Sequence, residues 1–255
     1  MSIMIGHAGS DEHGKYTGGT AGDQKGTEVC VREWYNRPWN VVLRPKSAYV
    51  AADMVRAMRD ACANDNIGYD QNQRTTLYTQ AKAVDWVITK ITTPCETDCS
   101  ALIAVCANAA GVKVSKDIYT GNMVKALKAT GQFDVLTDSK YLSSDQYLQA
   151  GDVLVYEGHH TAMALQYGAQ ATYRKGWNYD INGWFYSPSG ERDYLKNCWQ
   201  TINHHRYYFN DDGYALTNWQ IIGGKWYYFE PVAGNPLECA LYVTDADGVQ
   251  APGEF

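Results

Sequence analysis

Residues 97–106 read Thr-Asp-Cys-Ser-Ala-Leu-Ile-Ala-Val-Cys, and this stretch decides how the chain is organised. Apolar residues recur at three- and four-residue steps from Leu102 to Ala110, which predicts a largely buried helix that ends before Gly111. Cys99 then lies in the first helical turn. At that place a helix lowers the pKa of a thiol, and its backbone N–H groups face negative charge that develops nearby.

A histidine downstream supplies the base that such a thiol needs. Residues 151–163 read Gly-Asp-Val-Leu-Val-Tyr-Glu-Gly-His-His-Thr-Ala-Met, which predicts a hairpin with strands over 152–156 and 161–166. Alternation along the second strand puts the side chain of His160 on one defined face and turns His159 the other way. We therefore expect His160 to be the base and His159 to be an exposed hairpin residue.

In the part of the chain before Gly168, helices come first and strands later. This order predicts an α+β domain in which helices pack on an antiparallel sheet. Extended segments are expected over residues 27–35, 40–43 and 133–136, and helices from the N-cap Ser47 to Gly68, from Arg74 to Lys90, from Asn122 to Ala129 and from Ser143 to Leu148.

A second module begins after Gly168, where aromatic residues become frequent and helical spacing ends. Trp177, Trp199 and Trp219 each open a similar piece, 22 and 20 residues apart, which indicates a small repeated hairpin. We place the domain boundaries at 1–168 and 169–255.

The aromatic residues of this module are candidates for ligand binding. Rings on neighbouring hairpins can enclose a cation or stack on a sugar, and the alternative is that they form the core of the module; we expect both roles. The candidate ligand-binding residues are Trp177, Trp184, Trp199, Tyr207, Tyr208, Trp219, Trp226, Tyr227 and Tyr228.

Composition excludes several classes of function. The net charge of −6 and the lack of any Lys/Arg run argue against nucleic acid as a partner, and no run approaches the roughly 20 apolar residues of a membrane span. The N-terminus lacks the pattern of a secretory signal. The seven cysteines show no disulfide framework, and Cys95 and Cys99 lack a second pair of metal ligands. We expect no metal and no cofactor.

These motifs together resemble a known family. Asp-Cys-Ser at the start of a helix, followed about sixty residues later by Gly-Asp-Val-Leu and His-Thr-Ala-Met, resembles the NlpC-type and CHAP-type papain-like cell-wall hydrolases. Residues 18–24 and 34–45 are similar to phage or prophage endolysins of Gram-positive hosts. The resemblance, over residues 5–168, implies a papain-like fold and a Cys99–His160 enzyme that cuts an amide bond of peptidoglycan.

The repeats carry a second resemblance. Gly-Lys-Trp-Tyr-Tyr-Phe at 224–229 and Asp-Asp-Gly-Tyr-Ala-Leu at 211–216 resemble choline-binding and glucan-binding wall repeats. This implies attachment to teichoic-acid choline or to a wall polysaccharide. The protein would then be made in the cytoplasm without a signal peptide and act at the bacterial cell wall.

The family usually has a third polar residue, about a dozen positions beyond the histidine, that holds the imidazole ring. Only Gln170 or Thr172 could serve there, and Asp23 or Gln24 from the Gly-rich N-terminal loop are rival candidates. We expect His7 to be a surface residue.

Several functions remain open on these residues. The first is an endolysin that cleaves an amide bond of the peptide stem. The alternatives are N-acetylmuramoyl-L-alanine amidase specificity with the same catalytic pair, a non-catalytic wall adhesin, and an acyltransferase that uses the same thiol and imidazole. The sequence does not decide which amide is cut.

Overall fold

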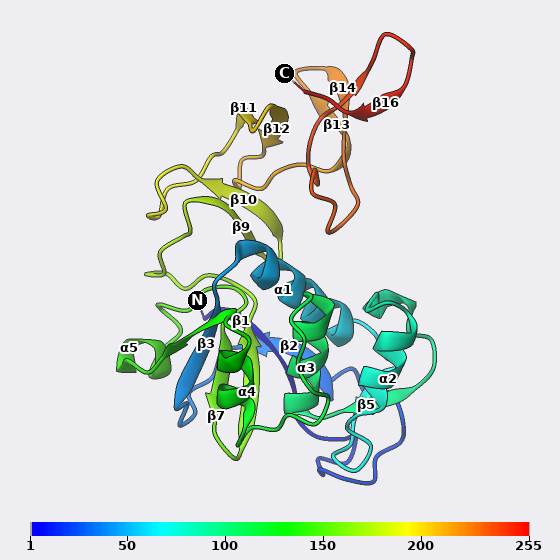
Figure 1. Ribbon diagram of the computed structural model, residues 1–255, viewed down its shortest axis with the longest axis vertical. Coiled ribbons are helices and arrows are strands. Elements are labelled where there is room, and N and C mark those ends of the chain that lie inside the picture. The colour runs from blue at the N-terminus through cyan, green and yellow to red at the C-terminus, as the bar shows by residue number, and fades with distance from the viewer. Residues whose placement is uncertain (1, 255) are drawn as a thin grey trace. The chain divides into compact units, whose positions relative to one another are not determined.

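The structure is a computed structural model that describes residues 2–254, and the chain divides after Thr172 into two compact units (Figure 1). Unit 1 ends at Thr172 and unit 2 begins at Tyr173. The elements of unit 1 are β1 (Met4–Ala8), β2 (Val29–Glu33), β3 (Val41–Pro45), α1 (Ala48–Cys62), β4 (Ile67–Tyr69), α2 (Thr76–Ala83), the 3₁₀ helix η1 (Ile88–Lys90), β5 (Cys95–Thr97), α3 (Cys99–Ala109), α4 (Met123–Ala129), β6 (Phe133–Leu136), α5 (Ser139–Leu142), β7 (Val153–Tyr156) and β8 (His160–Ala164).

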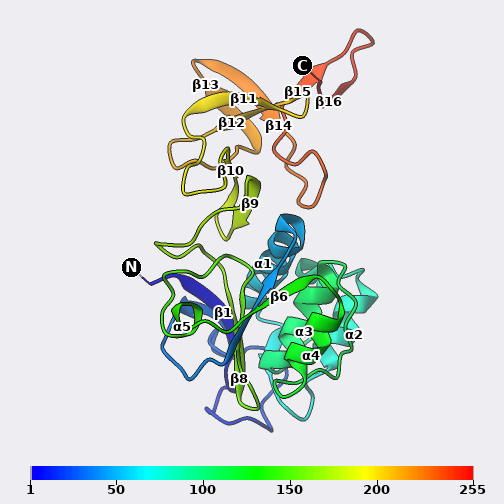
Figure 2. The ribbon, with the colours of Figure 1, turned by 60° about the vertical axis from the view of Figure 1, so that its left-hand side comes forward.

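The main sheet of unit 1 has the strand order β2-β1-β8-β7-β3-β6 in the described residues, and every neighbouring pair is antiparallel. Helices α1 and α3 pack on one of its faces (Figure 2). The packing is close, since a Cβ on Gly6 of β1 would lie 2.3 Å from Cγ of Met58 in α1. The predicted α+β domain with an antiparallel sheet is confirmed.

The N-terminal strand β1 is the element that the sequence analysis missed. It lies between β2 and β8, so the first strand of unit 1 neighbours its last one (Figure 2). Its pairing with β8 joins Ile5 to Ala164 and Gly6 to Met163. Beyond Gly6 the two strands part, and this opening positions the candidate site.

Several predicted helices are shorter than expected. Ser47 caps α1 as predicted, because its Oγ accepts from the N–H groups of the first turn, but the helix ends at Cys62. The helix predicted over 74–90 ends at Ala83, before two residues with left-handed backbone at 85–86. The prediction of a helix over 143–148 is wrong, because the short helix α5 (Ser139–Leu142) ends before this segment. Within the segment, the Asp145 side chain accepts a hydrogen bond from the N–H of Ile3.

The sheet face opposite α1 and α3 has its own hydrophobic core. Side chains of β1, β3, β7 and β8 pack there against the loop after β2 and the segment around α5. The buried members are Ile3, Ile5, Trp39, Val42, Leu148, Leu154, Ala162 and Ala164. Because His7 and His160 alternate in register with Ile5 and Ala162, their side chains share this face.

A buried ion pair crosses the edge of this core. Arg44 Nη2 lies 2.6 Å from Oδ2 of Asp152, whose side chain is fully buried and also accepts from the N–H of Gln149. We expect Arg44→Ala to lower the free energy of unfolding by about 3–5 kcal/mol, because it leaves an unpaired buried carboxylate. Lys46→Ala, which removes an exposed ion pair to Asp134, is the control and should cost at most about 1 kcal/mol. Equal losses in urea unfolding would contradict this account.

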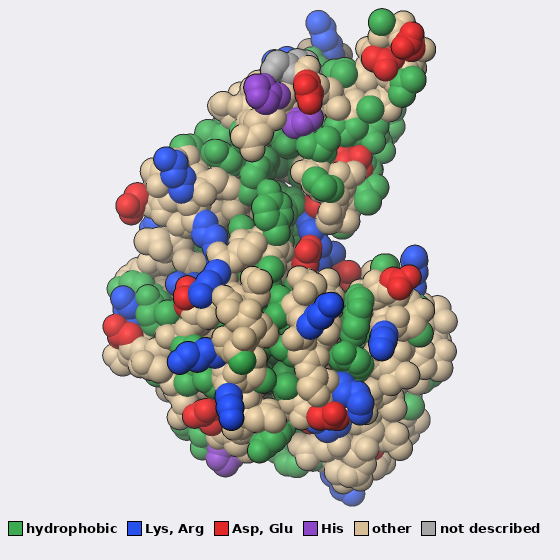
Figure 3. Space-filling model, in the orientation of Figure 1, with side chains coloured by type: hydrophobic (Ala, Val, Ile, Leu, Met, Phe, Trp, Pro, Cys, Tyr) green, Lys and Arg blue, Asp and Glu red, His purple; other side chains and the backbone are tan. Residues whose placement is uncertain are grey.

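In the described residues of unit 2, the three tryptophan-led repeats form two-stranded hairpins as predicted, and a fourth hairpin follows them. They are β9 (Gly176–Asp180) with β10 (Gly183–Ser187), β11 (Cys198–Ile202) with β12 (His205–Phe209), β13 (Asn218–Ile222) with β14 (Lys225–Phe229), and β15 (Tyr242–Thr244) with β16 (Gln250–Pro252). Phe209 and Phe229 are fully buried, whereas Trp219 and Trp226 are exposed. Hydrophobic side chains therefore supply both the core and part of the surface of this unit (Figure 3).

None of the helices in the described residues combines the length and the hydropathy that a membrane crossing requires.

Candidate active site

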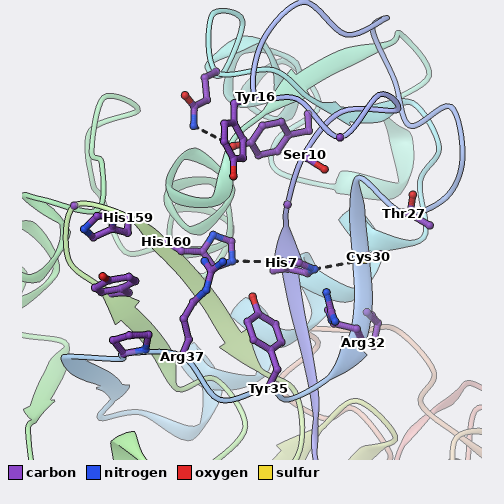
Figure 4. Close-up of a pocket in the computed structure, with 18 of the residues that line it drawn as sticks. His7, Ser10, Tyr16, Thr27, Cys30, Arg32, Tyr35, Arg37, His159 and His160 are labelled. Carbon is purple, nitrogen blue, oxygen red and sulfur yellow. Dashed lines mark hydrogen bonds between the residues drawn. The ribbon is translucent and has the colours of Figure 1, made fainter.

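Two histidines from neighbouring strands form the centre of the site. His160 opens β8 and His7 lies near the end of β1, and His160 Nε2 lies 3.4 Å from His7 Nδ1 (Figure 4). Both side chains are buried, at 7% and 6% exposure, so the expectation that His7 lies on the surface is wrong. Burial, followed by the positive charges of His7 and the nearby arginines, lowers the pKa of His160 to about 3. Burial, followed by the same arginines, lowers the pKa of His7 to about 4. Both rings are therefore neutral at pH 7.

The helix that carries Cys99 forms as predicted, and β5 leads directly into it. Cys99 is its first residue, and the N–H of Thr161, the residue after His160, points at the Cys99 sulfur. This N–H faces the side of β8 on which β1 has already parted from it. The thiol therefore lies where the two strands open, next to the start of β8. In the described residues no hydrogen bond joins this thiol to the His160 ring.

The state of the Cys99 thiol differs from the sequence-based expectation. Burial, followed by the negative charge of Asp98, raises its pKa to about 12 against the smaller effects of the N–H groups of Thr161 and Ser100. The helix N-terminus does not lower the pKa of Cys99 as expected, because Asp98 is the N-cap of this helix. Its Oδ1 accepts from the N–H groups of Ser100, at 2.9 Å, and Ala101, at 2.7 Å. These two groups are not available to hold an oxyanion, and the N–H of Cys99 is the next candidate.

Asp98 is itself held by Arg74. The guanidinium bonds both carboxylate oxygens and also donates to Oγ of Ser100 at 2.8 Å and to the carbonyl of Ile118 at 2.6 Å. This network fixes the first turn of α3 and hence the position of Cys99.

A pocket of about 960 Å³ opens beside the histidines. His7, His160 and His159 line it, together with Cys30 and the exposed arginines Arg32 and Arg37, and Tyr16, Tyr35 and Tyr69 also contribute to its walls. Figure 4 shows the rings of His7 and His160 turned toward each other and His159 set apart from them. The two arginines place positive charge along the pocket, which favours anionic ligand groups.

The four residues proposed for the third polar role lie elsewhere. Gln170 and Thr172 are exposed, and neither they nor Asp23 and Gln24 line the pocket. Asp23 is buried and braces its loop, accepting from the N–H groups of residues 25, 27, 28 and 29. Gln24 donates to carbonyls within the same turn.

Sequence reasoning missed the roles of His7, which contacts the ring of His160, and of Cys30, which contacts His7. Cys30 of β2 is paired with His7 in the sheet, and its Sγ lies 3.7 Å from His7 Nε2. A period-two pattern over residues 4–8 would have revealed β1, but its Gly6 and its position at the chain start gave a weak signal. The pairing of β1 with β8 joins Ile5 to Ala164 and Gly6 to Met163, residues 159 and 157 positions apart, which no local pattern shows.

The Gly-rich loop after β1 is held by buried carboxylates. Glu28 accepts from the N–H of Tyr69, and Glu96 accepts from the N–H of Gly22. Asp11, Glu12 and His13 place three potential metal-ligand atoms within 4.8 Å of one another in this loop, in the described residues. The reaction of a cysteine thiol with an amide does not use these three residues.

Burial and the neighbouring acid Glu28 raise the pKa of Glu96 to about 8. A carboxyl with a raised folded-state pKa stabilises the fold at low pH and loses that contribution as pH rises through 8. We expect Glu96→Gln to raise the free energy of unfolding relative to the parent by on the order of 2–4 kcal/mol at pH 9, and by much less at pH 5. Glu157→Gln, at an exposed site, is the control for urea unfolding at both values. A gain independent of pH would contradict a neutral Glu96.

Two family models match the chain. A model described as an endolysin-like domain matches residues 5–171. The chain belongs to the endolysin-like domain family. A second model, described as a choline-binding repeat, matches residues 195–236 of this endolysin-like chain. No curated protein sequence matches this chain.

Solved structures give partial likenesses. The pneumococcal cell wall endolysin from phage Cp-1, complexed with choline, is 22% identical over 36% of this endolysin-like chain and 30% of its own, with a TM-score of 0.23. Choline binding protein F from Streptococcus pneumoniae is 25% identical over 47% of this chain and 42% of its own, with a TM-score of 0.24. The chain thus spans less than half the length of these proteins. It combines an endolysin-like domain with choline-binding repeats.

Proposed function

We propose that the chain is a peptidoglycan hydrolase of the papain-like NlpC or CHAP type that uses Cys99 as nucleophile and His160 as base. The observation that carries the proposal is the position of the Cys99 sulfur at the N–H of Thr161, one residue from His160, at the opening between β1 and β8. Residues 2–172 supply the catalytic domain and residues 173–254 the wall-binding module.

The chemistry is acyl transfer from an amide. Since thiol and imidazole are both neutral in the free protein, proton transfer accompanies the attack and no preformed ion pair is needed. His160 Nε2 faces His7, so Nδ1 is the atom that takes the thiol proton. Sulfur bonds to the substrate carbonyl, the protonated imidazole gives its proton to the leaving amine, and water then releases the acyl group from Cys99.

His7 takes the third role in this proposal. It lies on the strand next to His160 and faces the ring nitrogen that the thiol does not use. A neutral His7 that accepts from Nε2–H of His160 fixes the tautomer of the base and stabilises the imidazolium when it forms. The third polar group then comes from the N-terminal strand and not from the segment after β8.

The repeats of unit 2 hold the enzyme on its substrate. Trp177 and Trp199 each face rings of the following hairpin at centroid distances of 4.9 Å. Such aromatic boxes recognise quaternary ammonium groups. The match to choline-binding repeats supports teichoic-acid choline as the ligand.

Mass spectrometry of fragments released from purified walls tests the activity and identifies the bond. A stem endopeptidase releases fragments with a new amino terminus inside the stem, whereas an N-acetylmuramoyl-L-alanine amidase releases whole stems that begin at the first residue. Walls that bind the protein and release no fragments would favour the non-catalytic adhesin.

A further inference from the structure

Unit 2 contains two sites that are built between consecutive hairpins. At the first site, Trp177 of β9 faces Tyr207 and Phe209 of β12. The ring centroids lie 4.9 and 5.8 Å from that of Trp177, with interplanar angles of 68° and 31°. Trp184 of β10 forms a further wall, with its centroid 6.0 Å from Trp177.

The second site repeats this geometry one hairpin later. Trp199 of β11 faces Tyr227 and Phe229 of β14 at 4.9 and 5.9 Å, with interplanar angles of 66° and 32°. The two sites thus agree to 0.1 Å and 2° in these contacts. Both should offer similar surfaces to a cation.

The two sites differ at one wall. Trp184 comes seven positions after Trp177, and the residue seven positions after Trp199 is Arg206. The Cζ atom of Arg206 lies 4.5 Å from the centroid of the Trp199 ring. This distance is within the about 6 Å over which a guanidinium is attracted to an aromatic face. The second site already holds a cation from its own chain.

We propose that Arg206 is an internal occupant of the second site, so that a quaternary ammonium ligand binds the first site and is excluded from the second. This inference rests on the proposed function, in which the repeats bind choline. Arg206 therefore sets how many ligand groups each molecule can hold. It also makes the first site, around Trp177, the anchoring one.

The third hairpin does not replace the lost site. Trp219 and Trp226 stand at the positions of Trp177 and Trp184 but are 59% and 65% exposed. The following strand β16 has Pro252 as its third residue, where β12 and β14 have tyrosines. The ring that would close this box is missing in the described residues.

Choline titration of the full chain by calorimetry tests the inference. The variants are Arg206→Trp, which copies the first site, and Arg206→Ala. Arg192→Ala is the matched control, because Arg192 lies over the ring of Tyr173, outside both sites. We expect Arg206→Trp to bind about one choline equivalent more than the parent, and at least about tenfold more tightly at the second site. Arg192→Ala should titrate like the parent.

Four outcomes separate the inference from the function on which it rests. A parent that binds choline, with Arg206 variants that titrate identically, overturns the inference alone. A parent that binds choline, with about one further equivalent bound by Arg206→Trp, supports it. Choline binding by Arg206→Trp and not by the parent overturns it, because the first site then does not bind the ligand. If no protein binds choline, the proposed ligand is wrong, and NMR then decides the role of Arg206. Upfield-shifted side-chain protons of Arg206 support stacking on Trp199, and random-coil shifts overturn it.

Discussion

Cys99→Ala is expected to reduce the lysis of isolated walls to background, a loss of at least about 10⁴-fold, while wall binding by unit 2 is unchanged. In the proposed mechanism the variant lacks the atom that attacks the amide carbonyl, and the remaining groups cannot form an acyl intermediate. The fold should survive because the side chain loses only its sulfur. Lysis is measured as turbidity loss of purified walls, and binding as protein that sediments with them.

Cys30→Ala is the matched control for this experiment. Cys30 also lies near an imidazole, since its sulfur is 3.7 Å from His7 Nε2, and it lines the pocket that Cys99 does not. Under the proposed mechanism Cys30→Ala retains lysis within a few-fold of the parent. Loss of activity in Cys30→Ala, with activity retained in Cys99→Ala, would transfer the nucleophile to Cys30 and make His7 its base.

His7→Phe is expected to lower kcat by about 10²-fold with little change in KM, because His160 loses the acceptor that fixes its tautomer. Phe keeps most of the buried ring volume, so the change separates hydrogen bonding from packing. His7→Gln offers a carbonyl oxygen at a similar reach and should recover part of kcat. The rates are measured on a soluble muropeptide across pH 5 to 9.

A purely structural role for His7 gives a different pattern. Both variants would then lower thermal stability and activity together, and Gln would rescue no better than Phe. An unchanged kcat in His7→Phe would remove His7 from the proposed mechanism.

The sequence carried the parts of the fold that local patterns encode. Hydrophobic spacing and the Asp-Cys-Ser start located α3, Ser47 marked the start of α1, and the tryptophan period located the hairpins of unit 2. Local sequence patterns also placed His160 at the start of a strand. These features depend on residues a few positions apart.

The features that the sequence did not predict depend on tertiary contacts. The neighbour of His160 is set by which strand pairs with β8, and that strand begins at residue 4. The state of the Cys99 thiol is set by burial and by the Asp98 cap, which removes the anion-binding capacity that a bare helix start has. A motif gives the residue types of such a site but not their partners or their charge.

The place of β1 in the sheet has a consequence for when the candidate site forms during folding. The histidines at the centre of the site stand 153 positions apart, on the two strands of the sheet that come first and last along the chain. Under the proposed mechanism, a nascent chain has no complete site until the ribosome has released β8, and closing so long a loop is slow relative to local folding. Under the proposed mechanism, a chain that lacks β8 therefore has no hydrolase activity, whatever the state of its other elements.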